Sequence, residues 1–533
     1  MKRRRFVNLM GGVAGLAVQP GIVTSVFAGG DKRGASDGVV GMYVHEGWPY
    51  KRPYAARTWT LEDWRGYAEG LNRIGYNMLA IWPALETMPD PLTPSDRANI
   101  EKTAKVIDML HKEFGMGAFL ILCPNTVTNN EVAAQYSFED RYLYGSSTYL
   151  DPADSVALGK MIKWREELLR PLANMDCLAI IDSDPGGYPG STNDQFVNLL
   201  MEHRKMLNRL RPGIELCYWM HVGWEAYSRY YATGNFAWGT PAEAEDVLTK
   251  LKKADPSPWR ITIHTMQEPP NGTDLQLAKK MGLASNSLAF NYGAIEGEPS
   301  FPMTNFGGDA AFKAGGAPAP GGVVGNAQTH CVQLPNTFAF VRGAKGLPVS
   351  EADYVQFADD LLTGKGQLLV RAWQALAGTD PNRMRAMADK LQALRSQDLV
   401  PGRLQGLLFG SPQRFISDLI YELRMQAAYL DLIASSKDKV DKEKFRSFLA
   451  ATVAWQGIHG YQTVWLWPGM ADVLKKLKSP AIDKLLVEAN YEKTQSQGTG
   501  NTPFERLQNF FRQWDAYTPR LIAAMEEALK GVE

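Results

Sequence analysis

Short apolar runs alternate with amphipathic helical patterns between about residues 38 and 290, and this alternation restricts the fold more than any other feature. Most runs are apolar at every position, which is typical of parallel strands buried on both faces. Their spacing is mostly about 35 to 40 residues, the length of one strand–helix unit. The runs lie at 39–45, 76–82, 116–123, 177–182, 214–220, 259–265 and 287–292, with an eighth candidate at 326–334. We therefore predict a (β/α)8 barrel, with residues 37–345 as its domain.

The helical segments between the runs carry recognisable end signals. The segment after the first run has Thr60 as a helix N-cap, Asp63 in the capping-box position and Gly75 as its end. An open doubly wound sheet is the alternative fold. It needs a glycine-rich phosphate loop after its first strand, and residues 45–54 do not supply one.

Two segments depart from the strand–helix alternation. Residues 293–325 are rich in Gly, Pro and Ala, and a connection of this length in a compact domain is typical of a functional loop. We expect it to form a partly ordered lid over the carboxyl ends of the strands. Beyond about residue 345 the patterns are almost entirely helical, so residues 346–533 are predicted to form a helical C-terminal domain.

The N-terminus resembles an export signal. Arg3 and Arg4 are followed by Phe6 and by a weakly apolar stretch, and Ala28 closes a small-residue cleavage pattern. Twin arginines in this position are typical of the bacterial twin-arginine signal. We therefore expect residues 1–28 to be a signal peptide, the export machinery to be a partner, and the mature protein to be periplasmic or secreted. The stretch is too short and interrupted for a stable membrane span.

Charge and motif content exclude several function classes. Lys plus Arg and Asp plus Glu both number 57, so nothing in the charge favours nucleic acid as a partner. The sequence has no Walker A motif, no G-x-S-x-G nucleophile elbow and no dinucleotide-binding glycine pattern after a strand. The four cysteines form no C-x-x-C pair, so no disulfide framework is implied. No cofactor is predicted.

Polar and aromatic residues recur where the predicted strands end. In barrels of this type the carboxyl ends of the strands carry the chemistry. We therefore expect the following residues to line one substrate-binding rim: His45, Glu46, Trp82, Asn125, Asp182, Asp184, Trp219, His221, His264, Asn291, Tyr292, Gln328 and His330.

Asp182 and Asp184 stand two residues apart at the end of an apolar run and before Pro185 and two glycines. One interpretation is structural, because Asp before Pro-Gly initiates turns and caps helices. The other is catalytic, because two close carboxyl groups raise one another's pKa, so that one can hold a proton while the other is charged. Glycoside cleavage uses such a carboxyl pair.

The histidines admit a metal-dependent alternative. His45, His221, His264 and His330 could converge at the rim. The sequence has no H-E-x-x-H motif or other fixed ligand spacing, so no metal is predicted. Histidines that hydrogen-bond a sugar are the favoured interpretation.

The layout resembles the exported glycoside hydrolases related to the N-acetyl-β-hexosaminidases, in which a carboxylate pair closes the fourth strand of a (β/α)8 barrel. Similar stretches lie at 57–61, 71–83 and 326–340. The resemblance implies a carbohydrate substrate and a mechanism in which the 2-acetamido group of the sugar attacks.

By the same resemblance, Asp184 would be the acid and Asp182 would orient the acetamido group, or the two roles would be reversed. Tyr292 would hydrogen-bond the acetamido oxygen and Trp219 would form the pocket floor. The family pair is usually adjacent, whereas Ser183 intervenes here. A conventional two-carboxylate mechanism would need Glu46 or Glu225 across the pocket.

The sequence therefore predicts a glycoside hydrolase of the cell envelope or the exterior. An exported barrel with other chemistry, such as a lyase or a metal-dependent hydrolase, and a non-catalytic glycan-binding protein are the alternatives.

Overall fold

The chain forms a closed barrel of eight parallel strands. The computed structural model describes residues 38–47, 52, 55–141, 143, 145–183, 186–256, 259–263, 274–291, 295, 319–327, 333–459, 468–489, 499–512 and 514–531. Around the barrel the strand order is β1-β10-β9-β8-β7-β6-β3-β2, which confirms the predicted (β/α)8 fold. The strands are β1 Val39–His45, β2 Met78–Trp82, β3 Gly117–Leu122, β6 Cys177–Ile181, β7 Glu215–Trp219, β8 Arg260–Ile263, β9 Ser287–Asn291 and β10 Gly322–Asn326.

The strands are apolar at nearly every position because both of their faces are covered. Successive side chains point alternately into the barrel and toward the surrounding helices. Tyr43 and Trp219 belong to the apolar cluster inside the barrel. Their neighbours Val44 and Tyr218 belong to the larger cluster between the barrel and the helices.

The eighth strand differs from its prediction. It is β10, which ends at Asn326, where the predicted run 326–334 begins. Gly322 lies opposite Val39 of β1 and has a φ of 127°, and a Cβ atom there would lie 2.2 Å from the Val39 carbonyl oxygen. Because only glycine tolerates both this conformation and this contact, the glycines that suggested a loop belong to the strand that closes the barrel.

Replacing Gly322 by Ala should lower the free energy of unfolding by about 2 to 5 kcal/mol, since backbone strain and steric overlap add. Urea denaturation of the purified variant measures this. Gly115→Ala is the matched control, because Gly115 has a φ of 62° with no atom within 4 Å of the added Cβ. It should lose only the strain of about 1 to 2 kcal/mol. Equal losses in the two variants would contradict the close contact between β1 and β10.

The helices that cover the barrel follow the strands in order. The first, α1, has the predicted ends: Thr60 and Asp63 form a reciprocal capping box, and Gly75 closes the helix with a φ of 115°. The covering helices are α1 Leu61–Ile74, α2 Pro94–Met109, α4 Ser155–Leu169, α5 Asn193–Leu210, α6 Trp224–Thr233, α7 Pro241–Ala254, α8 Asp274–Met281 and α10 Leu334–Ala344.

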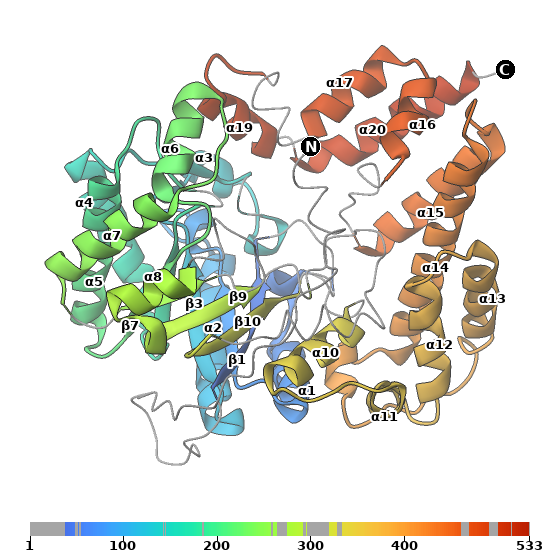
Figure 1. The fold of residues 1–533 in the computed structure, drawn as a ribbon, viewed down its shortest axis with the longest axis horizontal. Helices are drawn as coiled ribbons and strands as arrows, with labels where there is room; N and C mark the ends of the chain where they lie inside the picture. Colours follow the sequence, from blue (N-terminus) through green and yellow to red (C-terminus); the bar gives the residue numbers. More distant parts are fainter. Residues whose placement is uncertain are drawn as a thin grey trace.

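A helical region follows the barrel, as predicted, and lies beside it (Figure 1). The predicted domain boundary at 345/346 falls between α10 and α11. The helices are α11 Glu351–Leu361, α12 Gly366–Leu376, α13 Pro381–Gln392, α14 Pro412–Ser435, α15 Lys442–His459, α16 Met470–Lys476, α17 Pro480–Ala489, α19 Pro503–Arg512 and α20 Trp514–Lys530. None of the helices in the described part of the chain is long and apolar enough to cross a membrane.

The helical region docks on α1 through a short turn, η9 Gln405–Leu408. A Cβ atom at Gly406 would lie 2.1 Å from the carbonyl oxygen of Gly66, so the two backbones touch. The ring of Phe409 stacks on Tyr67 at a centroid distance of 5.6 Å. The C-terminal region is thus packed directly against the barrel wall.

Candidate active site

Four aromatic rings form a layer inside the barrel near the carboxyl ends of the strands. Tyr43 of β1 lies with its ring centroid 5.8 Å from that of Trp219 and 5.6 Å from that of Phe290. Trp82 of β2 lies 6.4 Å from both Tyr43 and Trp219. The four rings are buried and belong to the apolar cluster that fills the inside of the barrel.

Two histidines adjoin this layer on different sides of the barrel. His45 stacks on Trp82 at a centroid distance of 4.6 Å, and its Nδ1 accepts a hydrogen bond from the Gly47 N–H at 2.7 Å. The neutral ring therefore carries its proton on Nε2. His221 lies at the end of β7, and its Nδ1 is 2.7 Å from the Ser183 hydroxyl at the end of β6.

The buried polar groups at this level that have no partner among the described residues include two that lie on strands of the barrel and face inward. These two are the indole Nε1 of Trp219 and the amide oxygen Oδ1 of Asn326. Asn326 pairs in register with Tyr43, so its side chain shares the inward face of that residue. One group donates and the other accepts, which suits a ligand rich in hydroxyl groups. Sequence analysis missed Asn326, because it was assigned to the start of the eighth strand rather than to its end.

Comparison with known proteins shows likeness of fold only. No protein-family model matches the chain, and no curated protein matches it. The GH20 β-N-acetylhexosaminidase from Streptomyces coelicolor A3(2) is 13% identical over 63% of this chain and 69% of that one, with a TM-score of 0.37. A GH5_18 structure from Streptomyces cattleya in complex with GlcNAc is 11% identical over 67% and 92%, with a TM-score of 0.35. The N-acetylneuraminate lyase from Aliivibrio salmonicida is 10% identical over 73% and 96%, with a TM-score of 0.32.

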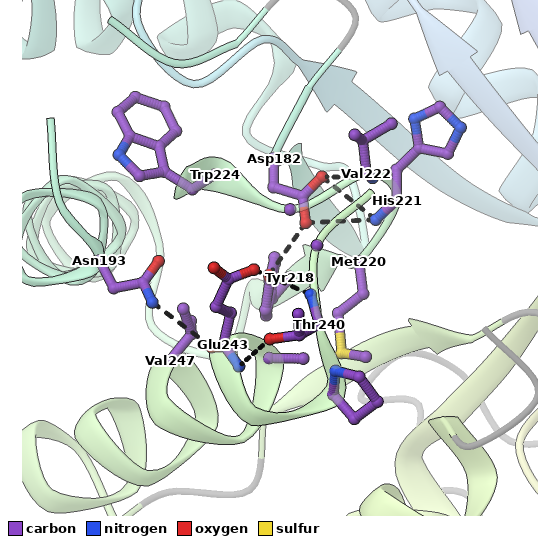
Figure 2. Close-up of a pocket in the computed structure, with 14 residues that line it drawn as sticks. Asp182, Asn193, Tyr218, Met220, His221, Val222, Trp224, Thr240, Glu243 and Val247 are labelled. Carbon is purple, nitrogen blue, oxygen red and sulfur yellow. Dashed lines mark hydrogen bonds between the residues drawn. The ribbon is translucent and has the colours of Figure 1, made fainter. Parts of the chain in front are cut away.

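Asp182 does not face the aromatic layer, which corrects the expectation that it shares a pocket with Trp219. Its carboxylate accepts hydrogen bonds from the Tyr218 hydroxyl at 2.9 Å and from the backbone N–H groups of His221 and Val222 at 3.1 to 3.2 Å. Figure 2 shows these bonds, and it shows the ring of His221 turned away from the carboxylate. The physical reason is strand alternation: Asp182 follows Ile180 on the helix-facing side.

Asp182 borders a small cavity between the barrel and the helices that both polar and apolar side chains line. The cavity has a volume of about 40 Å³ and is also lined by Asn193 and Glu243, which suits ordered water but not a sugar ring. Burial raises the pKa of the Asp182 carboxyl, and the charge of His221 and the hydrogen bonds to the carboxylate oppose the rise. Asp182 thus holds the turn after β7 and positions His221.

Replacing Asp182 by Asn should lower the free energy of unfolding by about 2 to 3 kcal/mol, because an amide cannot accept from all three donors and one remains unpaired. Tyr218→Phe removes a single donor and should cost about 1 kcal/mol. Thermal and urea denaturation compare the two variants. An Asp182→Asn protein of unchanged stability would contradict this structural role of Asp182.

The other predicted rim residues that the structure describes differ in orientation. Glu46 lies on the helix side of β1, where it accepts a hydrogen bond from Asn99 of α2. Asn291 follows Ala289 on the helix-facing side of β9. Asn125 donates hydrogen bonds to the carbonyl oxygens of Leu150 and Gly187 at 2.8 and 2.9 Å, so it ties together the loops after β3 and β6.

Five of the predicted site residues, Asp184, His264, Tyr292, Gln328 and His330, lie outside the described residues, as does most of the predicted lid. Their roles stay predictions. Among the residues that are described, no group of three or more His, Cys, Asp or Glu side chains could hold a metal ion.

A buried carboxylate that sequence analysis missed lies at the ends of β2 and β3. Glu86 belongs to the short helix η3 Leu85–Thr87. Its Oε1 accepts hydrogen bonds from Trp82 Nε1 at 3.3 Å and from the Cys123 N–H at 2.5 Å. Burial raises the pKa of Glu86, and the charge of Arg165 opposes the rise. No strand-end pattern marks Glu86, because it stands four residues beyond Trp82.

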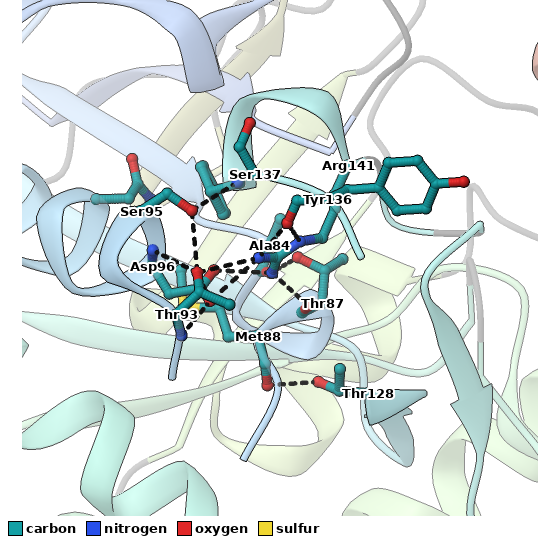
Figure 3. A network of polar contacts seen from close by, with 12 residues as sticks. Ala84, Thr87, Met88, Thr93, Ser95, Asp96, Thr128, Tyr136, Ser137 and Arg141 are labelled. Atoms are coloured by element: carbon teal, nitrogen blue, oxygen red, sulfur yellow. Dashed lines mark hydrogen bonds and ion pairs between the residues drawn. The ribbon is translucent and has the colours of Figure 1, made fainter. Parts of the chain in front are cut away.

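Two buried arginines hold the loops around this carboxylate. Arg141 forms an ion pair with Asp96 and also donates to the Thr87 carbonyl oxygen (Figure 3). Arg165 donates to the carbonyl oxygens of Pro124 and Thr126 at 3.0 and 2.9 Å. Arg141 therefore holds the backbone next to Glu86, and Arg165 holds the backbone on both sides of Asn125.

The helical region also reaches the loops at this end of the barrel. Phe504 of α19 lies 4.9 Å, between ring centroids, from Tyr149 of the strand β5 Ser147–Tyr149. It lies 5.1 Å from Tyr231 of α6 and 5.7 Å from Tyr188 of the loop after β6. The C-terminal residues therefore contribute to the rim above the strand ends.

Proposed function

We propose that this protein is a glycoside hydrolase whose substrate binds at the carboxyl ends of the barrel strands. The observation that carries the proposal is the aromatic layer, together with an unpaired donor on Trp219 and an unpaired acceptor on Asn326 at the same level. Sugar rings present apolar C–H faces to aromatic side chains, and their hydroxyl groups both donate and accept hydrogen bonds. Catalytic groups of such barrels stand at this end of the strands.

The proposed reaction breaks a glycosidic bond with carboxyl groups of the rim. Substrate-assisted cleavage of a 2-acetamido sugar, with Asp184 as the acid, follows from the sequence resemblance. Asp182 supports this reaction by holding the turn that carries His221. Action in the cell envelope or outside follows from Arg3 and Arg4 in the N-terminal segment.

A glycan-binding protein without turnover is the second candidate. The hydrogen bonds that occupy Asp182 favour it, because they leave one carboxylate fewer for chemistry. A lyase that forms a Schiff base is not favoured. The eight barrel strands, as described, contain no lysine that could supply the amine.

A screen of chromogenic aryl glycosides and of bacterial and plant glycans with the purified protein tests the proposal. We expect release of the aryl group from at least one sugar, and a loss of at least tenfold in kcat/KM when Trp219 is replaced by Ala. Binding of a glycan without any cleavage would favour the second candidate. Cleavage that EDTA abolishes and added metal restores would favour the metal-dependent alternative.

A further inference from the structure

Glu86 occupies an unusual position at the rim of the barrel. Between β2 and Glu86 the chain makes a tight reversal in which Ala84 adopts a left-handed conformation with a φ of 50°. Strained conformations of this kind in residues other than glycine concentrate at functional sites. The reversal turns the Glu86 carboxyl back to the ends of β2 and β3, where Trp82 and Cys123 donate to one of its oxygens.

The second carboxyl oxygen of Glu86 is unpaired. Its Oε2 is buried and has no hydrogen-bond partner among the described residues. Glu86 is 4% exposed, so water does not compensate freely for the missing bond. An unsatisfied buried oxygen costs stability, and at the carboxyl ends of the barrel strands a bound ligand could supply the missing partner.

The surroundings of Glu86 favour a carboxyl group that keeps its proton. Burial raises the pKa of Glu86, and the charged group that faces it is Arg165 from α4. The Cys123 thiol, just after β3, is neutral because burial raises its pKa well above the usual value. A buried carboxylic acid against an indole ring is an arrangement that serves general acids in glycoside cleavage. The indole here belongs to Trp82, whose ring is part of the aromatic layer.

We propose that Glu86, rather than Asp184, is the proton donor to the leaving-group oxygen of a sugar bound over Trp82, an inference that rests on the proposed function. The proton on Oε2 moves to the glycosidic oxygen as the C1–O bond breaks, and the electron pair of that bond stays on the leaving oxygen. Water then adds to C1 and returns its proton to the Glu86 carboxylate. Atoms and charge balance with water as the only co-reactant.

The test compares Glu86→Gln with the wild-type protein on two glycosides of the sugar that the screen identifies. On the phenyl glycoside, whose leaving group needs protonation, kcat should fall by about 10² to 10⁴-fold, the usual contribution of a general acid. On the 2,4-dinitrophenyl glycoside, whose leaving group needs no proton, it should fall by less than about tenfold. The basic limb of the pH profile should disappear in the variant.

Glu422→Gln is the matched control. Glu422 of α14 is also fully buried, and neither of its carboxyl oxygens has a partner in the part of the chain described. Any fall in kcat that Glu422→Gln causes should be the same on the phenyl and the 2,4-dinitrophenyl glycosides. If Glu86→Gln does not fold, Glu86→Asp, which keeps an acid, should retain part of the activity on the phenyl glycoside.

Equal losses on both glycosides would show that Glu86 only positions Trp82, and unchanged rates would remove it from the site. Either result overturns the inference while the proposed function stands. A wild-type protein that cleaves no glycoside overturns both.

Discussion

Replacing Arg141 by Met should lower the free energy of unfolding by about 3 to 5 kcal/mol, the usual effect of breaking one side of a buried ion pair. The side chains of Arg141 and Asp96 are both fully buried, and the guanidinium bonds both carboxylate oxygens at 2.8 and 3.1 Å. It also donates to the carbonyl oxygens of Thr87 and Tyr136. Without it, the Asp96 charge remains in the interior uncompensated. Urea denaturation gives the free energy.

The control is Arg73→Met on α1. Arg73 pairs with Glu69 at 2.6 Å, but both side chains are nearly half exposed, so its loss should cost no more than about 1 kcal/mol. The double variant Asp96→Leu/Arg141→Met should recover part of the stability, because no unpaired charge is left. If Arg141→Met were no more destabilising than Arg73→Met, the ion pair would not hold the rim. Thr87 adjoins Glu86, so activity should fall together with stability.

Acid should destabilise the protein through His203 on α5. The ring donates from Nδ1 to the Leu199 carbonyl oxygen at 2.8 Å and accepts at Nε2 from Arg165 at 2.8 Å. Burial, and then the charge of Arg165, lower the pKa of His203 from 6.5 to about 3. The neutral ring therefore stabilises the fold fully above pH 6.5, and this contribution is lost as the pH falls toward 3, because the unfolded chain binds the proton first.

The loss due to His203 should reach about 3 kcal/mol at pH 4 and approach about 5 kcal/mol near pH 3, since each pKa unit corresponds to about 1.4 kcal/mol. Denaturation curves of the wild-type protein and of His203→Gln between pH 7 and pH 4 measure this contribution. The free energy of unfolding of the variant should change less with pH. Parallel curves would contradict the lowered pKa. Arg165 also anchors the loop that carries Asn125, so protonation of the neighbouring His203 should disturb this part of the rim as well.

The first seven strands could be predicted because both faces of a barrel strand are covered, and each therefore reads as an uninterrupted apolar run. Because residues on both faces of such a strand are apolar, the sequence does not show which side chains point into the barrel and which point to the helices. Ile180 and Ile181 are both apolar and buried, although they point to opposite faces. No alternation in the sequence therefore indicated that Asp182 faces the helices. The eighth strand escaped prediction because the contact at Gly322 requires a residue that is otherwise typical of loops.

The candidate site was predictable where the side chain belongs to a strand end. His45, Trp82, Trp219 and His221 were all expected at the rim, and the structure brings them to the aromatic layer or beside it. Glu86 could not be found in this way, because its position depends on the reversal at Ala84 and on a hydrogen bond from another strand. These are tertiary features without a local sequence signal.

The pairing of β1 with β10 determines when the barrel can be completed during synthesis. Val39 cannot pair with Gly322 until the ribosome has added about 280 further residues. At ribosomal rates of about 5 to 20 residues per second, the open edge of the first strand persists for about 15 to 60 seconds. Through that interval an apolar strand edge is available to other chains, so a chaperone that shields residues 39–45 should raise the yield of folded protein more than one that binds the helical region.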